Sequence, residues 1–264
     1  MRRDYLFWGS LLILLGGLLF LNAAGISLPG GVHAMQLFWP AVLILLGGWI
    51  ILNSFWRGGV EAGPLAIDLQ GAQRASLRLN YGGGRMKLAA GAPAGQFLSG
   101  TASGRVEQKA NLSGDLLDAR LELTPDWLPP FSGGGEAGWD LRLNRDVPLK
   151  MRIDSGAAQS ELDLRDLQVT DLEFHTGASK TDLVLPAAAG MTTVKVELGA
   201  ASLDMLMPQG VAARIRVEGG AAAIDVDTDR FPYKNGVYES TDYASAQNRA
   251  EVTIQAGAGK VALR

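Results

Sequence analysis

The sequence predicts a protein of two parts: an N-terminal α-helical transmembrane hairpin, followed by an all-β, β-solenoid-like domain of stacked strand–glycine repeats. Three observations lead to this prediction. No Asp, Glu, Lys or Arg occurs from Tyr5 to Trp56, that stretch is internally duplicated, and the rest of the chain alternates apolar and polar residues between glycines. The 264 residues are 47% hydrophobic and 19% charged, which is typical of a folded chain.

The charge-free stretch divides into two spans, about residues 6–26 and 36–56. Each is about 20 residues long, the length that an α-helix needs to cross a ~30 Å hydrocarbon core. The spans are copies of each other, since Leu6-Phe7-Trp8 corresponds to Leu37-Phe38-Trp39 and the motif Leu-Ile-Leu-Leu-Gly-Gly occurs in both. We therefore expect a two-span hairpin at residues 1–57, with the lipid bilayer as its partner.

An alternative for the first span is a secretory signal peptide, because Arg2-Arg3, an apolar run and Ala23-Ala24 have the layout of one. The duplication favours the hairpin, since a cleaved signal has no reason to be repeated. Arg2, Arg3 and Arg57 flank the spans, and the loop between them has no Lys or Arg. The positive-inside rule then predicts a multi-pass protein of the cell membrane with both termini in the cytoplasm.

We expect a linker at residues 58–74 and the β-repeat domain at residues 75–264. The repeat is marked by a glycine after each apolar segment, with central spacings of 21, 22 and 21 residues: Gly82, Gly156, Gly177, Gly199, Gly220 and Gly257. Six residues beyond each glycine lies an apolar residue that is expected to point inward: Leu88, Leu162, Leu183, Met205, Val226 and Leu263. One unit of about 21 residues buries too few side chains to fold alone, so the units are expected to stack.

Two irregular stretches interrupt the repeat, Trp127–Gly135 and Asp229–Arg249. Their aromatic residues can be interpreted in two ways, as caps on the open ends of the stack or as a docking patch for a partner. The candidate docking residues are Trp127, Phe131, Phe231, Tyr233 and Tyr238.

The composition and the absence of catalytic motifs indicate a protein without enzyme activity. The chain has no cysteine and only two histidines, His33 and His175, so thiolate chemistry and a His-rich metal site are excluded. No nucleophile motif or phosphate-binding loop is present, and we expect no enzyme activity and no cofactor. The net charge of −3 makes nucleic acid an unsuitable partner.

One acidic pattern allows two interpretations. Five residues beyond four repeat glycines lie Glu161, Asp182, Asp204 and Asp225, which stacking would align in a column. The column is either a charged face that discourages edge association or a weak cation site.

The duplicated Leu-Phe-Trp and Leu-Ile-Leu-Leu-Gly-Gly hairpin resembles the LiaI/LiaF-type transmembrane region. The strand–glycine repeats, ending in Tyr238-Glu-Ser-Thr-Asp-Tyr243 and Val252-Thr-Ile-Gln-Ala-Gly257, resemble the toast-rack domain of LiaF-like cell-wall-antibiotic-response proteins. The resemblance implies an accessory protein of envelope-stress signalling that restrains a membrane sensor histidine kinase. It supplies no catalytic residue.

Two functional hypotheses follow. The first is a non-enzymatic membrane regulator of envelope-stress signalling that acts through contacts with a membrane sensor. The second is an outward-facing structural or adhesive module that binds cell-wall polymers. The sequence leaves open whether the chain also forms a homo-oligomer.

Overall fold

The computed structural model describes residues 16, 20, 62–123 and 138–264. The chain divides into two compact units, and the second, Gly59–Trp127 with Glu136–Arg264, holds the β domain. Apart from residues 16 and 20, the predicted transmembrane hairpin lies outside the described residues, as do the aromatic residues Trp127 and Phe131. Within the described ranges, no helix combines the length and the apolar character that crossing a bilayer requires.

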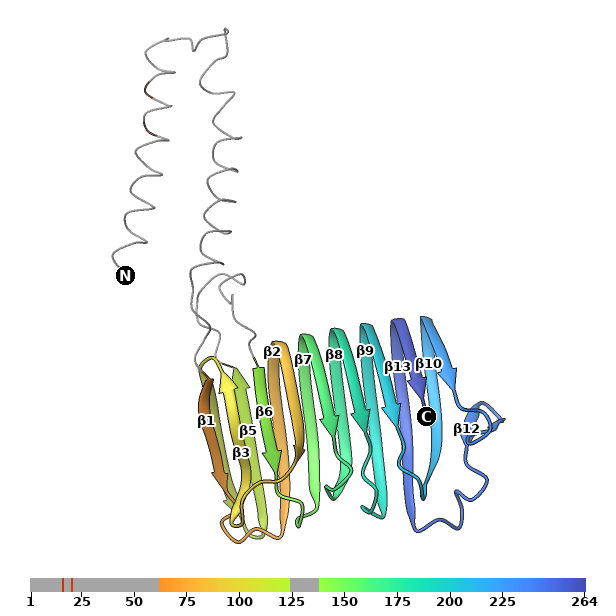
Figure 1. Cartoon of the computed structure of the whole chain (residues 1–264), viewed down its shortest axis with the longest axis horizontal. Coiled ribbons are helices and arrows are strands. Elements are labelled where there is room, and N and C mark those ends of the chain that lie inside the picture. The colour runs from red at the N-terminus through yellow and green to blue at the C-terminus, as the bar shows by residue number, and fades with distance from the viewer. Residues whose placement is uncertain (1–15, 17–19, 21–61, 124–137) are drawn as a thin grey trace. The chain divides into compact units, whose positions relative to one another are not determined.

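The described part of the domain is one sheet system of thirteen strands, and the β part of the predicted fold class is confirmed (Figure 1). The short strands are β1 (Ala62–Asp68), β3 (Gln96–Ser103), β4 (Val106–Ser113), β5 (Leu116–Leu123), β6 (Gly138–Leu143), β11 (Tyr233–Lys234) and β12 (Val237–Glu239). The long strands are β2 (Arg74–Ala90), β7 (Leu149–Asp163), β8 (Val169–Val184), β9 (Met191–Leu206), β10 (Val211–Val226) and β13 (Asn248–Leu263).

Each long strand contributes to two layers, because it doubles back near its repeat glycine (Figure 1). Strand β2 shows this in its pairing, since residues 74–80 lie beside β5 whereas residues 85–90 lie beside β6. We call the arms before the glycines, with β4, β5, β11 and β12, the first layer. The arms after the glycines, with β1, β3 and β6, form the second layer.

The core lies between the two layers. In β7 the buried residues alternate with exposed ones on both sides of Gly156, with Met151 and Ile153 on one arm and Leu162 on the other. The apolar residues predicted to point inward are at most 1% exposed, except Val226, which is partly buried on the terminal strand β10. Because buried and exposed residues alternate on both arms, each repeat unit has an apolar inner face on each arm. The neighbouring units continue these faces into one core.

The repeat glycines align from strand to strand and explain the spacing of the sequence repeat. None of the six has a positive φ, so a left-handed turn is not the reason for glycine. A Cβ on Gly156, Gly199 or Gly257 would instead lie 2.4, 2.8 or 2.7 Å from the carbonyl oxygen of the glycine in the neighbouring strand. Such separations are shorter than real Cβ contacts, so the close approach of the backbones requires glycine.

The strands do not follow their sequence order at the C-terminal end. Strands β7, β8 and β9 pair in parallel in order, but β13 lies between β9 and β10 and pairs with both. The last repeat of the sequence is thus the penultimate one in space, and β10 is the terminal long strand. The second arm of β10 is correspondingly open, with Ile224 41% exposed.

The predicted linker at residues 58–74 is wrong in part. Ala62–Asp68 forms β1, which pairs antiparallel with β3 at the edge of the second layer. The apolar alternation of Leu65 and Ile67, both buried, is the signal for this strand. Its brevity and the preceding glycines are typical of a linker, which is why local pattern alone does not identify the strand.

The insert between β10 and β13 covers the first arm of β10. Strand β12 pairs with Arg214 and Ile215 of β10, and the Asn235-Gly236 turn, with positive φ at both residues, joins β11 to β12. The Arg230 guanidinium donates to the backbone carbonyl oxygens of Met207 and Pro208 at 2.6 and 2.7 Å. These contacts make the insert a cap on one layer only.

Candidate functional site

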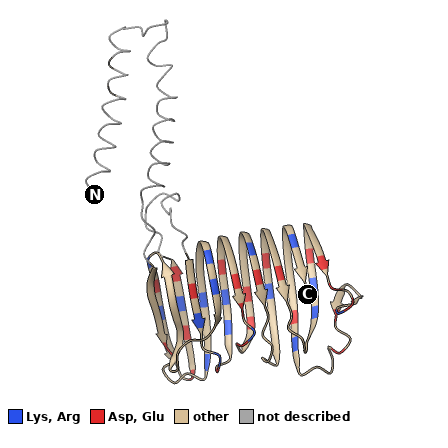
Figure 2. Ribbon diagram, in the orientation of Figure 1, with Lys and Arg blue, Asp and Glu red and all other residues tan. Residues whose placement is uncertain are grey.

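Charged residues recur along the strands of the sheet system (Figure 2). On the outer face of the first layer they form two parallel rows of opposite charge. They arise because outward positions alternate with buried ones, and in-register pairing aligns those positions from strand to strand. The basic row consists of Lys109, Arg120, Arg78, Arg152, Lys195 and Arg216, interrupted by Glu173 and Thr253. The acidic row consists of Glu107, Glu122, Asp154, Glu197 and Glu218, with Asn80, His175 and Gln255 at the remaining positions.

Several ion pairs connect the two rows within one strand. Lys109 Nζ lies 2.8 Å from Glu107 Oε1, and Lys195 Nζ lies 2.7 Å from Glu197 Oε1. These pairs are two residues apart, the spacing that places side chains on the same face of a strand. Exposed pairs of this kind contribute little to stability, so the rows are better understood as a surface pattern than as a stabilising device.

The two rows are most closely linked around Arg152. Its guanidinium donates to Asp154 Oδ2 at 2.9 Å and to Glu173 Oε2 at 2.8 Å, and His175 Nδ1 lies 2.9 Å from Asp154 Oδ1. Partial burial raises the pKa of Asp154, but the hydrogen bonds from Arg152 and His175 outweigh it and hold the pKa below its ordinary value. The hydrogen bond from Lys195 likewise lowers the pKa of Glu197.

These shifts predict that acid weakens the fold. A carboxyl whose folded-state pKa lies below its unfolded value stabilises the protein fully above the unfolded value, near 4, and loses that contribution as pH falls through the folded one. We expect the urea midpoint of the full-length protein in neutral detergent to fall from pH 7 to pH 3, and to fall less in Arg152→Gln. The control is Arg216→Gln, because Arg216 lies in the same row and forms no ion pair with a described residue. An unchanged acid dependence in Arg152→Gln would contradict this assignment.

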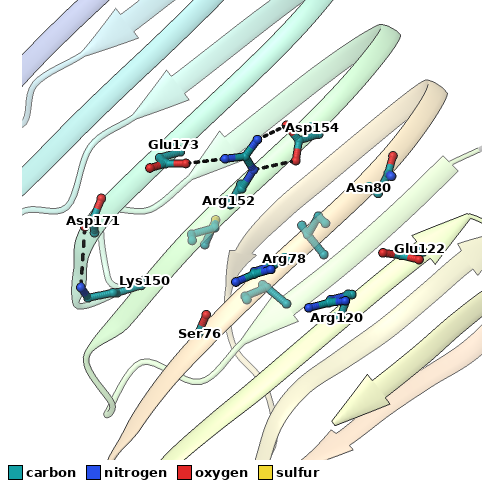
Figure 3. Close-up of a pocket in the computed structure, with 13 residues that line it drawn as sticks. Ser76, Arg78, Asn80, Arg120, Glu122, Lys150, Arg152, Asp154, Asp171 and Glu173 are labelled. Atoms are coloured by element: carbon teal, nitrogen blue, oxygen red, sulfur yellow. Dashed lines mark hydrogen bonds and ion pairs between the residues drawn. The ribbon is translucent and has the colours of Figure 1, made fainter. Parts of the chain in front are cut away.

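A groove of about 530 Å³ opens on the same face near β5, β2 and β7 (Figure 3). Its polar lining includes Ser76, Arg78, Asn80, Arg120 and Lys150. Lys150 lies 3.8 Å from Asp171. No ion pair or side-chain hydrogen bond joins the guanidinium of Arg78 or Arg120 to another residue that the structure describes, and no dashed line reaches either in Figure 3.

The predicted acidic column lies on the outer face of the second layer and is not continuous. Glu161, Asp182 and Asp204 are neighbours in register, but Ala262 of β13 separates Asp204 from Asp225. The altered strand order causes this interruption, because β13 lies between β9 and β10. Lys87 lies 3.0 Å from Glu161, and within the described ranges no group of three acidic or histidine side chains is arranged to hold a metal ion.

The predicted docking residues of the insert separate into different environments. Phe231 is 0% exposed and belongs to the core, so its prediction as a docking residue is wrong. Tyr238 is partly buried against the core, and Tyr233 is 60% exposed and packs on it with ring centroids 4.8 Å apart. Among the described candidates, Tyr233 has the exposure that a partner contact requires.

The two charged rows were not among the sequence predictions, although a local signal exists. A motif of a cation, an apolar residue and an acid occurs three times, and its acid lies two positions before a repeat glycine. The three copies are Arg152-Ile-Asp154, Lys195-Val-Glu197 and Arg216-Val-Glu218. Reading the outward positions before each glycine, rather than only those after it, reveals both rows.

The comparisons with known proteins agree with this architecture. Residues 58–206, more than half of the chain, match the model of the family described as the N-terminal domain of toast_rack, DUF2154. A crystal structure of a "putative cell adhesion protein" from Clostridium sporogenes is similar, with a TM-score of 0.67 and 19% identity over 77% of this chain and 99% of that one. At this identity the likeness shows the fold alone. No curated protein matches the chain at a significant level. From the family match, supported by the stacked two-layer fold, the chain belongs to the toast-rack family.

Proposed function

We propose that this protein is a non-enzymatic bacterial membrane protein, an accessory or regulator of envelope-stress signalling that acts through protein contacts with a membrane sensor. The observation that carries the proposal is the pair of charged rows across the first layer. The predicted hairpin would hold the domain at the membrane, and the resemblance to LiaF-like proteins supports the signalling role.

The charged face is suited to a transient interaction with a partner. Exposed charges steer association and select partners with the complementary pattern, while contributing little net affinity. Continuous strand pairing places neighbouring positions along each row ~4.8 Å apart, the distance between adjacent strands. The charge pattern is therefore held in a fixed geometry by the sheet. A sensor domain with opposite charges at a similar spacing would match it.

We expect association to need both the hairpin and the charged face. The test is co-purification of a membrane sensor histidine kinase with the tagged full-length chain after cross-linking in native membranes. Deletion of residues 1–57 is expected to abolish co-purification, and Lys195→Glu to reduce it several-fold, because the charge reversal disrupts the match.

The control for the charge reversal is Lys87→Glu, which changes the same charge on the outer face of the second layer. Undiminished co-purification after deletion of residues 1–57 would contradict the proposal. Equal losses for Lys195→Glu and Lys87→Glu would show that overall charge, rather than the first-layer face, governs the contact.

A second candidate function is an outward-facing adhesive or structural module that binds cell-wall polymers. The observation in its favour is the fold likeness to the Clostridium sporogenes protein, whose name refers to cell adhesion. The two functions place the domain on opposite sides of the membrane. A C-terminal reporter that fluoresces only in the cytoplasm separates them, since fluorescence is compatible with the regulator and its absence favours the adhesive module.

A further inference from the structure

The basic row contains four consecutive cations on four neighbouring strands: Lys109, Arg120, Arg78 and Arg152. The outer two are neutralised, because Lys109 pairs with Glu107 and Arg152 pairs with Asp154 and Glu173. The inner two, Arg120 and Arg78, are register partners, and neither guanidinium forms an ion pair or hydrogen bond with a described residue. Like charges directly opposite each other on a sheet are unfavourable, so this arrangement needs an explanation.

The sequence of β2 explains why Arg78 has no acidic partner within its own strand. In β7 and β9 the residue two positions beyond the cation is acidic, Asp154 and Glu197, whereas in β2 it is Asn80. Asn80 cannot neutralise a guanidinium, but its amide can donate a hydrogen bond to an anion. Glu122 lies two positions beyond Arg120, and no ion pair joins them within the described residues.

The two arginines line the groove of about 530 Å³ rather than an open ridge. Ser76, Arg78 and Asn80 alternate along one face of β2, and Arg120 enters from β5 (Figure 3). The acids on the far side of the groove are already engaged, since Asp154 and Glu173 bind Arg152 and Asp171 lies 3.8 Å from Lys150. Of the acids that line the groove, Glu122 alone is left to balance the charges of Arg78 and Arg120. This part of the groove therefore carries a net positive charge.

We propose that Arg78 and Arg120 form a binding site for a phosphate group, with Ser76 and Asn80 as additional donors. A guanidinium presents paired N–H donors that match the oxygens of a phosphate, and two neighbouring guanidinium groups match its charge and its several oxygens. A single carboxylate has one charge and two oxygens, which one arginine satisfies. The site is independent of the signalling role and would exist with either function.

The experiment titrates the full-length protein, in neutral detergent, with inorganic phosphate, methyl phosphate, dimethyl phosphate and acetate at constant ionic strength, followed by calorimetry. We expect saturable binding of phosphate compounds and none of acetate over the same range. Arg78→Gln and Arg120→Gln are each expected to weaken phosphate binding about tenfold, since each removes charge-assisted hydrogen bonds. The matched control is Arg216→Gln, in the same basic row but beside Thr253, which should bind as the wild type does.

The phosphate compounds distinguish the sources of the ligand. Tighter binding of inorganic and methyl phosphate supports a free or terminal phosphate, whereas equal binding of dimethyl phosphate supports the diester of a lipid headgroup or polymer. Arg78 is exposed and Arg120 is half-buried, and melting temperatures equal to that of the wild type check that both variants are folded. Absence of saturable binding, equal binding of acetate, or an equal loss in Arg216→Gln would overturn the proposal.

Discussion

Replacing Gly156 with Ala is expected to lower the melting temperature of the β domain by about 5–15 °C. The new Cβ would lie 2.4 Å from the carbonyl oxygen of Gly82 in the neighbouring strand, and backbone cannot move aside as a flexible side chain would. Overpacking of this kind costs about 2–4 kcal/mol, and each kcal/mol shifts the melting temperature of a domain of this size by about 2–4 °C. Circular dichroism at a β-sheet wavelength during heating measures the effect.

The matched control for this prediction is Gly63→Ala in the edge strand β1. A Cβ at Gly63 meets no heavy atom within 4 Å, and a strand glycine without that restriction is slightly unfavourable to begin with. Gly177→Ala should fall between the two, because its Cβ would lie 3.3 Å from the carbonyl oxygen of Gly156. Equal melting temperatures for Gly156→Ala and Gly63→Ala would show that the strands can separate at no cost, and the close-approach explanation would fail.

The second large effect is expected at Phe231 in the insert. Phe231→Ala should destabilise the domain by about 3–5 kcal/mol, because the side chain is 0% exposed and its removal leaves a cavity between the insert and the core. Hydrogen exchange is expected to rise first in Val211–Ile215, where β12 and Ser240 cover the first arm of β10. Denaturant unfolding and exchange mass spectrometry measure the two effects.

Tyr233→Ala provides the contrast within the same insert. Its side chain is 60% exposed and packs on Tyr238, so its loss should cost about 1 kcal/mol or less. A cost equal to that of Phe231→Ala would contradict the division of the insert into a buried cap and an exposed tip. If the insert also contacts a partner, Tyr233→Ala is the variant that should affect binding without unfolding β10.

The strand order places the insert where a cap is needed. Because β13 returns between β9 and β10, the chain must cross the end of the stack before it pairs, and the insert makes that crossing. Edge strands expose unpaired backbone groups that promote association, and covering them is one remedy. Here β12 covers only the first arm of β10, and the second arm, with Ile224 exposed, keeps an open edge.

Local pattern alone determined much of the β domain. The glycine spacing predicted the repeat unit, including Gly82 as an early member, since an identical backbone arrangement recurs in each unit. Period-2 alternation identified the inward residues such as Leu162 and Leu263, because the two faces of a strand have opposite environments wherever one is buried. Such signals are short-range and survive in a single sequence.

Three features were decided only by the tertiary structure. Strand order depends on which strand edge the chain pairs with after the insert. The spacing of the repeat glycines therefore does not predict the exchange of β10 and β13 or the interruption of the acidic column at Ala262. The burial of Phe231 depends on where the insert packs, since an aromatic residue suits a cap and a docking patch equally well. The Arg78–Arg120 pair joins residues 42 positions apart, and only the parallel pairing of β2 with β5 brings them together. Local periodicity determines which face a residue occupies, but long-range pairing determines its neighbours.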